Sequence, residues 1–215
     1  MEGVVEMKVL LVNGSPHKEG CTYTALSEVA QALNKNGVET EIFQLGSDPI
    51  ASCKGCGSCR KTGKCVTDDV VNEFIGKVDE ADGFVFGSPV HFAAASGSLT
   101  SFLDRVFFID KSKFAGKLGA SVISCRRGGA IAAFDQINKY FTISCMPIVS
   151  SQYWNQVHGN TPEEVKQDLE GLQTMRTLGN YMAWLLKCIE AGKNAGVPAP
   201  EQVRDGKCPE IGNVS

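Results

Sequence analysis

Four of the nine cysteines of this 215-residue chain lie close together, at Cys53, Cys56, Cys59 and Cys65. The segment around them, from Gly46 to Lys64, is rich in Gly, Ser, Cys and Lys and shows no sustained hydrophobic period. It is therefore predicted to be a loop folded around something other than its own side chains. A reducing cytoplasm does not normally preserve structural disulfides, so thiols clustered in this way indicate a metal site.

The loop that begins at Gly14 has the composition of a phosphate site. It has the sequence GSPHKEGCT and offers hydroxyl groups, glycines, two basic side chains and the amide groups of a predicted helix N-terminus. A phosphate fits there because oriented N–H groups and the positive end of the helix dipole meet its charge. An ordinary strand-to-helix turn is the alternative.

Two further loops can lie against a flat ring. The segment from Ser88 to Ala93 combines apolar and aromatic side chains with a few polar groups. The segment from Ser124 to Gly129 ends in a glycine pair, which lets backbone N–H groups approach ring oxygens closely. Together these loops predict a flat ligand. His91 could equally be a hydrogen-bonded structural residue with no contact to the ligand.

Short apolar strands alternate with helices along the chain, and this alternation positions all three loops. The strands are expected at 7–13, 39–44, 83–87, 119–124 and 147–151, and the helices at 22–36, from Thr67 or Asp68 to 80, at 99–107, at 130–141, and from the cap Thr161 to 191. The pattern predicts an α/β fold with a parallel sheet covered by helices on both faces. Ligands of such sheets lie outside the carboxyl ends of the strands, where the three loops begin.

The bulk properties exclude several classes of protein. The formal net charge of -3 argues against a phosphate backbone as the main partner, so we expect no nucleic acid. The apolar runs are far shorter than the roughly 20 residues of a membrane-spanning helix, and the first residues lack an apolar signal core. We therefore expect no membrane association and a cytoplasmic protein. One domain is predicted over residues 1–192, followed by a C-terminal tail over 193–215.

Several other side chains are expected to have structural roles only. Cys125, Cys145 and Cys188 are predicted to be buried, since an isolated cysteine usually behaves as a small apolar residue. Tyr153 and Trp154 are predicted to pack in the core.

As a set, the GSPHKEGCT loop, the SPVHF loop ahead of FLDR and the RRGG loop resemble the NADPH-dependent FMN reductases of flavodoxin-like fold, over residues 7–155. The resemblance implies a five-stranded parallel sheet of strand order 2-1-3-4-5. It places the FMN phosphate near Ser15, His17, Lys18, Cys21 and Thr22. It also implies that the isoalloxazine ring is lined by Pro89, Val90, His91 and Phe92. The polar edge of the ring would then face Arg127, Gly128 and Gly129. The family more often has tyrosine at the position of His91.

The spacing Cys53-x2-Cys56-x2-Cys59-x5-Cys65 resembles the compact motif of the iron–sulfur flavoproteins, a branch of the same superfamily that carries a 4Fe-4S cluster next to FMN. Four thiolates in a glycine-rich loop can wrap a cubane, because each iron takes one sulfur ligand. Zinc is a second alternative, although two spacings that share a middle cysteine fit one tetrahedron poorly. A loop without metal is the third.

The resemblance implies flavin chemistry, in which the protein positions and tunes the ring. In the first function, NAD(P)H reduces FMN, which then reduces a quinone, an azo or nitro compound, or free flavin. In the alternative, an iron–sulfur flavoprotein carries electrons between ferredoxin and an acceptor. A zinc-stabilised binding protein on the same scaffold is a third hypothesis. The flavin site of this family commonly lies between subunits, so we expect a homodimer or homotetramer.

Overall fold

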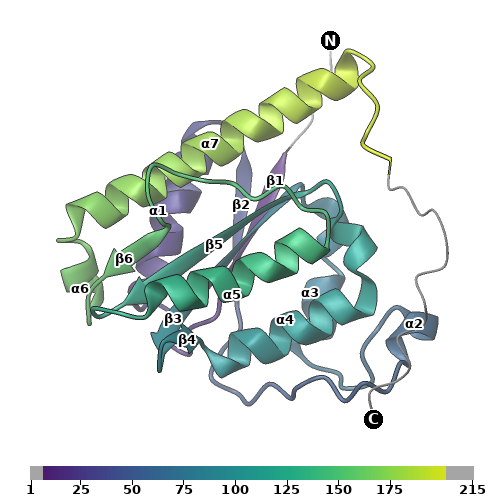
Figure 1. The fold of residues 1–215 in the computed structure, drawn as a ribbon, viewed down its shortest axis with the longest axis horizontal. Coiled ribbons are helices and arrows are strands. Elements are labelled where there is room, and N and C mark those ends of the chain that lie inside the picture. The colour runs from purple at the N-terminus through teal and green to yellow at the C-terminus, as the bar shows by residue number, and fades with distance from the viewer. Residues whose placement is uncertain (1–6, 202–215) are drawn as a thin grey trace.

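A central parallel sheet organises residues 7–201, the part of the chain that the computed structural model describes. Its strands are β1 (Lys8–Asn13), β2 (Glu39–Gln44), β3 (Gly83–His91), β5 (Leu118–Cys125) and β6 (Gln156–His158). They lie in the order β2-β1-β3-β5-β6, and each neighbouring pair on this path is parallel (Figure 1). The predicted flavodoxin-like sheet and its strand order are therefore confirmed.

The inner strands form because their residues are apolar on both faces. Every residue of β5 is buried, as is every residue of β1 after the first. Strands of this kind are typical of parallel sheets, whose connecting helices cover both sides. The register places Leu11 of β1 beside Val85 of β3, so aliphatic side chains continue across the sheet.

Helices cover both faces of the sheet, as predicted. α1 (Cys21–Lys35) and α7 (Leu169–Asn194) pack on one face, and α3 (Val70–Ile75), α4 (Gly97–Asp110) and α5 (Ala130–Ile143) pack on the other (Figure 1). The short elements are α2 (Cys59–Thr62), α6 (Pro162–Val165), the 3-10 turns η1 (Val78–Glu80) and η2 (Lys111–Phe114), and β4 (Ala94–Ala95), which pairs antiparallel with β3.

The two faces are packed in different ways. On the α4 side aromatic rings interlock, as where Phe74 meets Phe102 edge to face with ring centroids 5.1 Å apart. Aromatic pairs in this arrangement add stabilisation beyond the area that they bury. On the other face α1 and α7 approach closely at Gly179, where a Cβ atom would lie 2.7 Å from the Cβ of Ala32.

The position of the fifth strand was predicted incorrectly. It was expected at 147–151, where Ile148 forms a single bridge with Gly119. The continuous pairing begins later, where Gln156–His158 runs beside β5. Residues 149–155 form no strand between the two pairings, and within them the Ser151 hydroxyl donates to the side-chain oxygen of Asn155 at 2.6 Å.

The helix after the cysteine loop differs from the prediction at both ends. The helix expected from Thr67 or Asp68 starts at Val70, because Asp69 is its cap and accepts the N–H of Val71. This helix stops at Ile75, and residues 78–80 form the separate turn η1.

The predicted C-terminal helix is divided in two. Thr161 caps its start as expected, accepting the N–H of Glu164 at 3.2 Å. The first piece, α6, ends after one turn, because Asp168 caps a new helix by accepting the N–H of Gly171. α7 then runs to Asn194, so the predicted tail begins inside its last turn. Residues 202–215 of that tail, with Cys208, lie outside the described residues.

Four of the side chains expected to be buried lie on the surface instead. Cys125 is buried as predicted, but Cys145 and Cys188 are exposed. Tyr153 and Trp154 are each about half exposed, because they lie on the segment that leaves the sheet before β6. Within residues 7–201, none of the helices combines the length and the apolar character needed to cross a membrane.

Candidate functional site

Asn13, the last residue of β1, organises the first predicted ligand loop. Its buried side-chain amide donates hydrogen bonds to the carbonyls of His17 at 3.2 Å and Lys18 at 3.3 Å, and to the side chain of Gln44 at 2.6 Å. Gln44 in turn donates to the carbonyl of Ser15 at 2.8 Å. The loop is therefore fixed from the ends of both β1 and β2.

The start of α1 has the character of an anion site. Gly20 is its N-cap, and among the described residues no side chain caps the helix and no acid occurs in its first turn. Ser15 is buried and accepts the backbone N–H of His17 with its hydroxyl oxygen at 3.2 Å, whereas the side chains of His17 and Lys18 are exposed. Open amide groups at a helix start, beside two basic side chains, fit a phosphate.

The side chains of Cys21 and Thr22 join α1 to the neighbouring strands. Thr22 is buried, and its hydroxyl lies 2.7 Å from that of Ser124 at the end of β5. The Cys21 thiol points toward the carbonyl of Gly159 at 3.8 Å. Burial raises the pKa of this thiol, and the charges of nearby glutamates raise it further, so it stays protonated at neutral pH. That Cys21 and Thr22 lie near a bound phosphate stays a prediction.

The second predicted loop is the end of β3 and its turn into β4. The strand was expected to end at Gly87, but it continues through Ser88 and Pro89, which pair with β5, to His91. Phe92 and Ala93 form the tip of this β3–β4 hairpin with positive φ angles of 49° and 61°, a region that residues other than glycine rarely adopt. Phe92 is fully exposed and His91 is exposed, while Pro89 and Val90 are half-buried. Strain of this kind persists where the surrounding structure enforces it, and it is common at functional sites.

The third predicted loop packs against that hairpin. Gly129 has a φ of 85°, and a Cβ atom there would lie 2.8 Å from the Cα of Ala93. Only glycine satisfies both conditions, so the loop is held at this residue. The preceding residues, Arg126, Arg127 and Gly128, are exposed.

Hydrogen bonds complete the connection of the three loops. The hydroxyl of Ser96, the N-cap of α4, donates to the carbonyl of Gly14 in the first loop at 2.9 Å. The N–H of Ser96 donates to Ser88 in the second loop at 2.9 Å. The structure therefore brings the loops that carry the predicted FMN residues together at the carboxyl edge of the sheet, while the individual contacts with FMN stay predictions.

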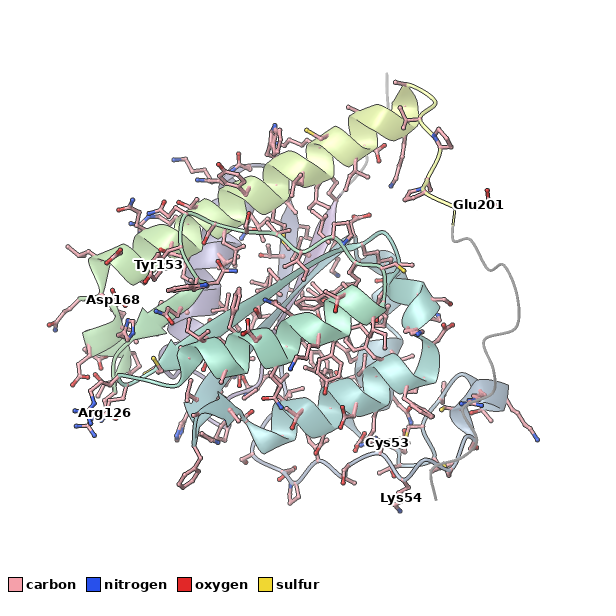
Figure 2. All side chains as sticks on the ribbon, viewed as in Figure 1. Cys53, Lys54, Arg126, Tyr153, Asp168 and Glu201 are labelled. Carbon is pink, nitrogen blue, oxygen red and sulfur yellow. The ribbon has the colours of Figure 1, made fainter. Side chains whose placement is uncertain are left out.

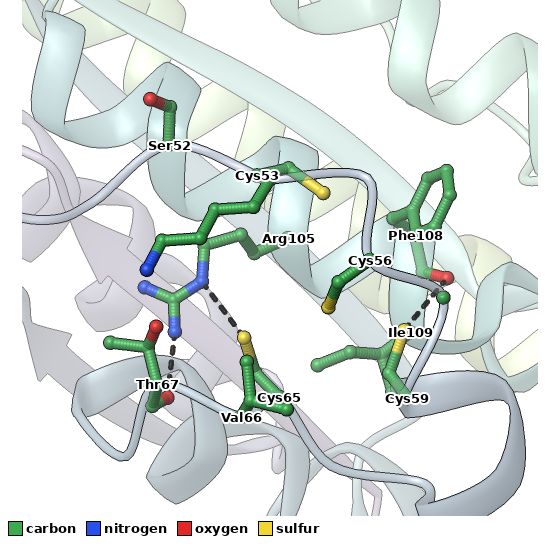
Figure 3. A pocket seen from close by; sticks show the side chains of 12 residues that line it. Ser52, Cys53, Cys56, Cys59, Cys65, Val66, Thr67, Arg105, Phe108 and Ile109 are labelled. Carbon is green, nitrogen blue, oxygen red and sulfur yellow. Dashed lines mark hydrogen bonds between the residues drawn. The ribbon is translucent and has the colours of Figure 1, made fainter.

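The four clustered cysteines line one pocket (Figure 3). Cys53 and Cys56 are exposed, Cys59 and Cys65 are half-buried, and all four are free thiols. The empty space in and in front of the pocket, open solvent included, is about 400 Å³, and the α4 residues Phe108 and Ile109 form part of the pocket wall.

Glycines let the chain turn sharply between the thiols. Gly55, Gly57 and Gly63 have φ angles of 64°, 67° and 68°, which glycine adopts without steric cost. Among residues 7–201, no group of three potential ligands is close enough to share one metal ion. A zinc ion needs all its sulfurs about 2.3 Å away, whereas a cubane takes one thiolate on each iron. Four thiols spread around one pocket therefore fit a cluster better than a single ion.

A buried arginine, absent from the sequence-based prediction, lies in the same pocket. Arg105 donates from Nε to the Sγ of Cys65 at 3.3 Å, and its two terminal nitrogens contact the Asp69 carboxylate at 2.6 and 2.9 Å. Burial acts to lower the pKa of Arg105, but the hydrogen bonds that it donates to Asp69 and Cys65 outweigh burial, so the guanidinium stays charged. Position 105 follows Phe102 by three residues and precedes Ile109 by four, which puts it on the buried side of the predicted helix.

The cysteine pocket and the third flavin loop lie apart within one chain. Figure 2 shows Arg126 at the lower left of the molecule and Cys53 at the lower right. Arg105 is about two turns along α4 from its N-terminus, or about 12 Å at the helical rise of about 1.5 Å per residue. The two candidate cofactor sites are therefore separate within this chain.

An open parallel sheet with its ligand loops at the carboxyl edge defines a flavodoxin-like protein. This chain belongs to the NADPH-dependent FMN reductase family, whose profile matches residues 7–161. It is 34% identical over 194 residues to an iron–sulfur flavoprotein of Methanocaldococcus jannaschii, covering 86% of this chain and 100% of the relative. It is 27% identical to an iron–sulfur flavoprotein of Methanosarcina thermophila, covering 87% of this chain and 100% of the relative.

Solved structures show the same fold at low sequence identity. A flavone reductase matches with a TM-score of 0.67 at 18% identity, covering 86% of this chain and 64% of the other. An NAD(P)H:quinone oxidoreductase from Methanothermobacter marburgensis matches with a TM-score of 0.62 at 14% identity, covering 82% and 96%. A flavodoxin from the domain Archaea matches with a TM-score of 0.56 at 15% identity, covering 84% and 99%.

Proposed function

We propose that this protein is an iron–sulfur flavoprotein that carries electrons between ferredoxin and an acceptor. The observation that carries the proposal is the convergence of Cys53, Cys56, Cys59 and Cys65, all free thiols, on one pocket. These four thiols would hold a 4Fe-4S cluster, and the three loops at the carboxyl edge would hold FMN. When bound, the cluster supplies one-electron transfer and the flavin supplies transfer of one or two electrons.

The protein's own residues would bind and orient the flavin. The start of α1, with His17 and Lys18 beside it, would neutralise the phosphate. The hairpin tip at Phe92, held in place by Gly129, would cover the ring, and the exposed Arg127 would face its polar edge. None of these roles requires a side chain to form a covalent bond with substrate.

The relatives favour the electron carrier over the NAD(P)H-dependent reductase. Both curated relatives matched over their full length are named iron–sulfur flavoproteins. The family profile favours the reductase, in which NAD(P)H reduces FMN and the flavin reduces a quinone, an azo or nitro compound, or free flavin. The electron donor distinguishes the two functions.

The test is anaerobic purification of the wild-type protein and of Cys56→Ser, followed by visible spectroscopy and iron and sulfide analysis. We expect flavin bands and about four irons per chain in the wild type, and a large loss of iron in the variant with flavin retained. Cys188→Ser is the matched control, because Cys188 is an exposed thiol on α7 outside the pocket, and it should keep its iron. Flavin without iron in the wild type would refute the cluster.

The donor is tested by following flavin absorption during rapid mixing. Reduced ferredoxin should bleach the flavin faster than NADPH at equal concentration. A faster reaction with NADPH, followed by turnover with a quinone, would establish the reductase instead.

The partners and the assembly state are also proposals. Ferredoxin or a small-molecule acceptor is the expected partner, in the cytoplasm and without nucleic acid or membrane. A homodimer or homotetramer would bring cofactor sites of different chains together, and exposed aromatic residues such as Trp154 and Trp184 offer apolar surface for it. Light scattering of the cofactor-loaded protein tests this assembly, and a monomer at micromolar concentration would contradict it.

A further inference from the structure

We infer that Arg105 is a positioning residue for the cysteine pocket and that it makes reduction of a bound cluster more favourable. The inference rests on the proposed function, since it concerns a cluster held by Cys65. It goes beyond that function because it assigns control of the potential to one buried side chain outside the four-cysteine motif.

The first argument is that the orientation of the guanidinium is fixed. Asp69 contacts both terminal nitrogens, at 2.6 and 2.9 Å, and the Arg105 side chain is only 2% exposed. Asp69 is itself held in place, because its Oδ1 accepts the N–H of Val71 as the cap of α3. This fork-to-fork contact leaves Nε pointing at the Sγ of Cys65.

The second argument is that Arg105 holds both ends of the cysteine loop. One terminal nitrogen donates to the carbonyl of Ala51 at 3.4 Å, and the other donates to the carbonyl of Thr67 at 2.8 Å. These two residues flank the four cysteines in the sequence. Asn72 adds a further restraint, accepting the N–H of Cys65 at 2.8 Å and donating to its carbonyl at 3.0 Å.

The third argument is electrostatic. Reduction adds one negative charge to a cluster, and a fixed cation with an N–H directed at a ligand sulfur stabilises the reduced state more than the oxidised state. The other cations of the loop, such as Lys54 and Lys61, are exposed and are therefore screened by water and salt. Arg105 is buried and directs its Nε–H at the Cys65 sulfur, so its effect on the potential should exceed theirs even though Asp69 balances its net charge.

The experiment is a potentiometric titration of anaerobically purified protein. Arg105→Lys keeps the charge but removes the Nε donor, and Arg105→Gln removes both. We expect the cluster midpoint potential to fall in the order wild type, Lys, Gln. From wild type to Arg105→Lys the reduction equilibrium should fall about tenfold, which is 59 mV for a one-electron couple. Lys61→Gln is the matched control, and its midpoint should stay close to that of the wild type.

Each outcome identifies what fails. Wild-type protein without iron would refute the proposed function. Variants that load iron but keep the wild-type potential would overturn the tuning role while leaving the iron–sulfur flavoprotein intact. A midpoint in Lys61→Gln that shifts as far as in Arg105→Lys would also overturn it, because loop charge alone would then explain the effect.

A second measurement tests the positioning role without iron. Hydrogen exchange of the iron-free protein should be faster over residues 51–69 in Arg105→Lys than in the wild type, with α7 unchanged. Equal exchange over this segment would overturn the positioning role. If Arg105→Gln fails to fold, Arg105→Lys still supplies both readouts, because it keeps the buried charge beside Asp69.

Discussion

The buried hydroxyl pair between Thr22 and Ser124 permits a quantitative test of how the first and third loops are joined. The two oxygens lie 2.7 Å apart, and both residues are buried, at 1% and 4% exposure. Thr22→Val keeps the shape of the side chain but leaves the Ser124 hydroxyl without its partner. An unsatisfied buried hydroxyl costs about 1 to 3 kcal/mol, so we expect this loss in the free energy of unfolding.

The double variant should behave differently from the sum of the singles. Ser124→Ala should cost a similar amount, but Thr22→Val with Ser124→Ala removes both polar groups and should cost no more than either single, a coupling of about 1 kcal/mol or more. Urea unfolding measures it. With a slope of about 3 kcal/mol per molar for a chain of this size, each single variant should lower the midpoint by about 0.3 to 1 M.

Thr24→Val is the matched control for this cycle. Its hydroxyl donates to the carbonyl of Gly20 at 3.1 Å from a half-buried position, where water can replace the bond. Its effect should stay within about 0.5 kcal/mol. Additive losses for Thr22→Val and Ser124→Ala would show that the two hydroxyls do not act as a pair. FMN retention should be measured in the same variants, because a structural loss could otherwise be taken for a lost phosphate contact.

Two further predictions concern stability. Gly129→Ala should lower the free energy of unfolding by about 2 kcal/mol or more, since alanine is strained at a φ of 85° and its Cβ would lie 2.8 Å from Ala93. Gly128→Ala is the control and should change the free energy of unfolding little, because a Cβ there would meet no described atom within 4 Å beyond the adjacent residues. Equal losses in thermal unfolding would contradict this prediction. Hydrogen bonds from Lys77 and then Lys8 hold the pKa of Glu41 below its usual value, so its contribution is present above the unfolded-state pKa of about 4.3 and is lost as pH falls through the folded-state pKa. Wild type should therefore lose more stability than Glu41→Gln between about pH 7 and about pH 3, and parallel urea profiles would refute the link.

The sheet could be predicted from sequence because its inner strands are short apolar runs, although β3 continues past Ser88 and Pro89 to His91. The edge strand was harder to place. Ile148 and Val149 are apolar, but only Ile148 forms a bridge to the sheet. The longer pairing is made by Gln156–His158, which has one buried apolar residue. A polar edge strand leaves a weak periodic signal, so its register depends on contacts that local sequence does not show.

The candidate site was predictable in its loops and not in its internal contacts. Sequence placed the cysteines and the glycine-rich turns together, because loops at the carboxyl edge follow from the strand pattern. It did not find Arg105, whose partners lie in two different segments, nor the left-handed tip at Phe92, since propensity argues against that conformation for an aromatic residue. The one available signal for Arg105 was a charge at an apolar helical position.

The hydrogen bonds by which Arg105 joins Ala51 to Thr67 would affect how the proposed cluster is loaded. Bringing the ends of a long loop together has an entropic cost. Here the hydrogen bonds from Arg105 to the carbonyls of Ala51 and Thr67 offset that cost. Small zinc domains, in contrast, are unfolded until their metal binds. In a chain that closes its own ligand loop, loading and loss of the proposed cluster would be local events that do not require the sheet and its helices to unfold.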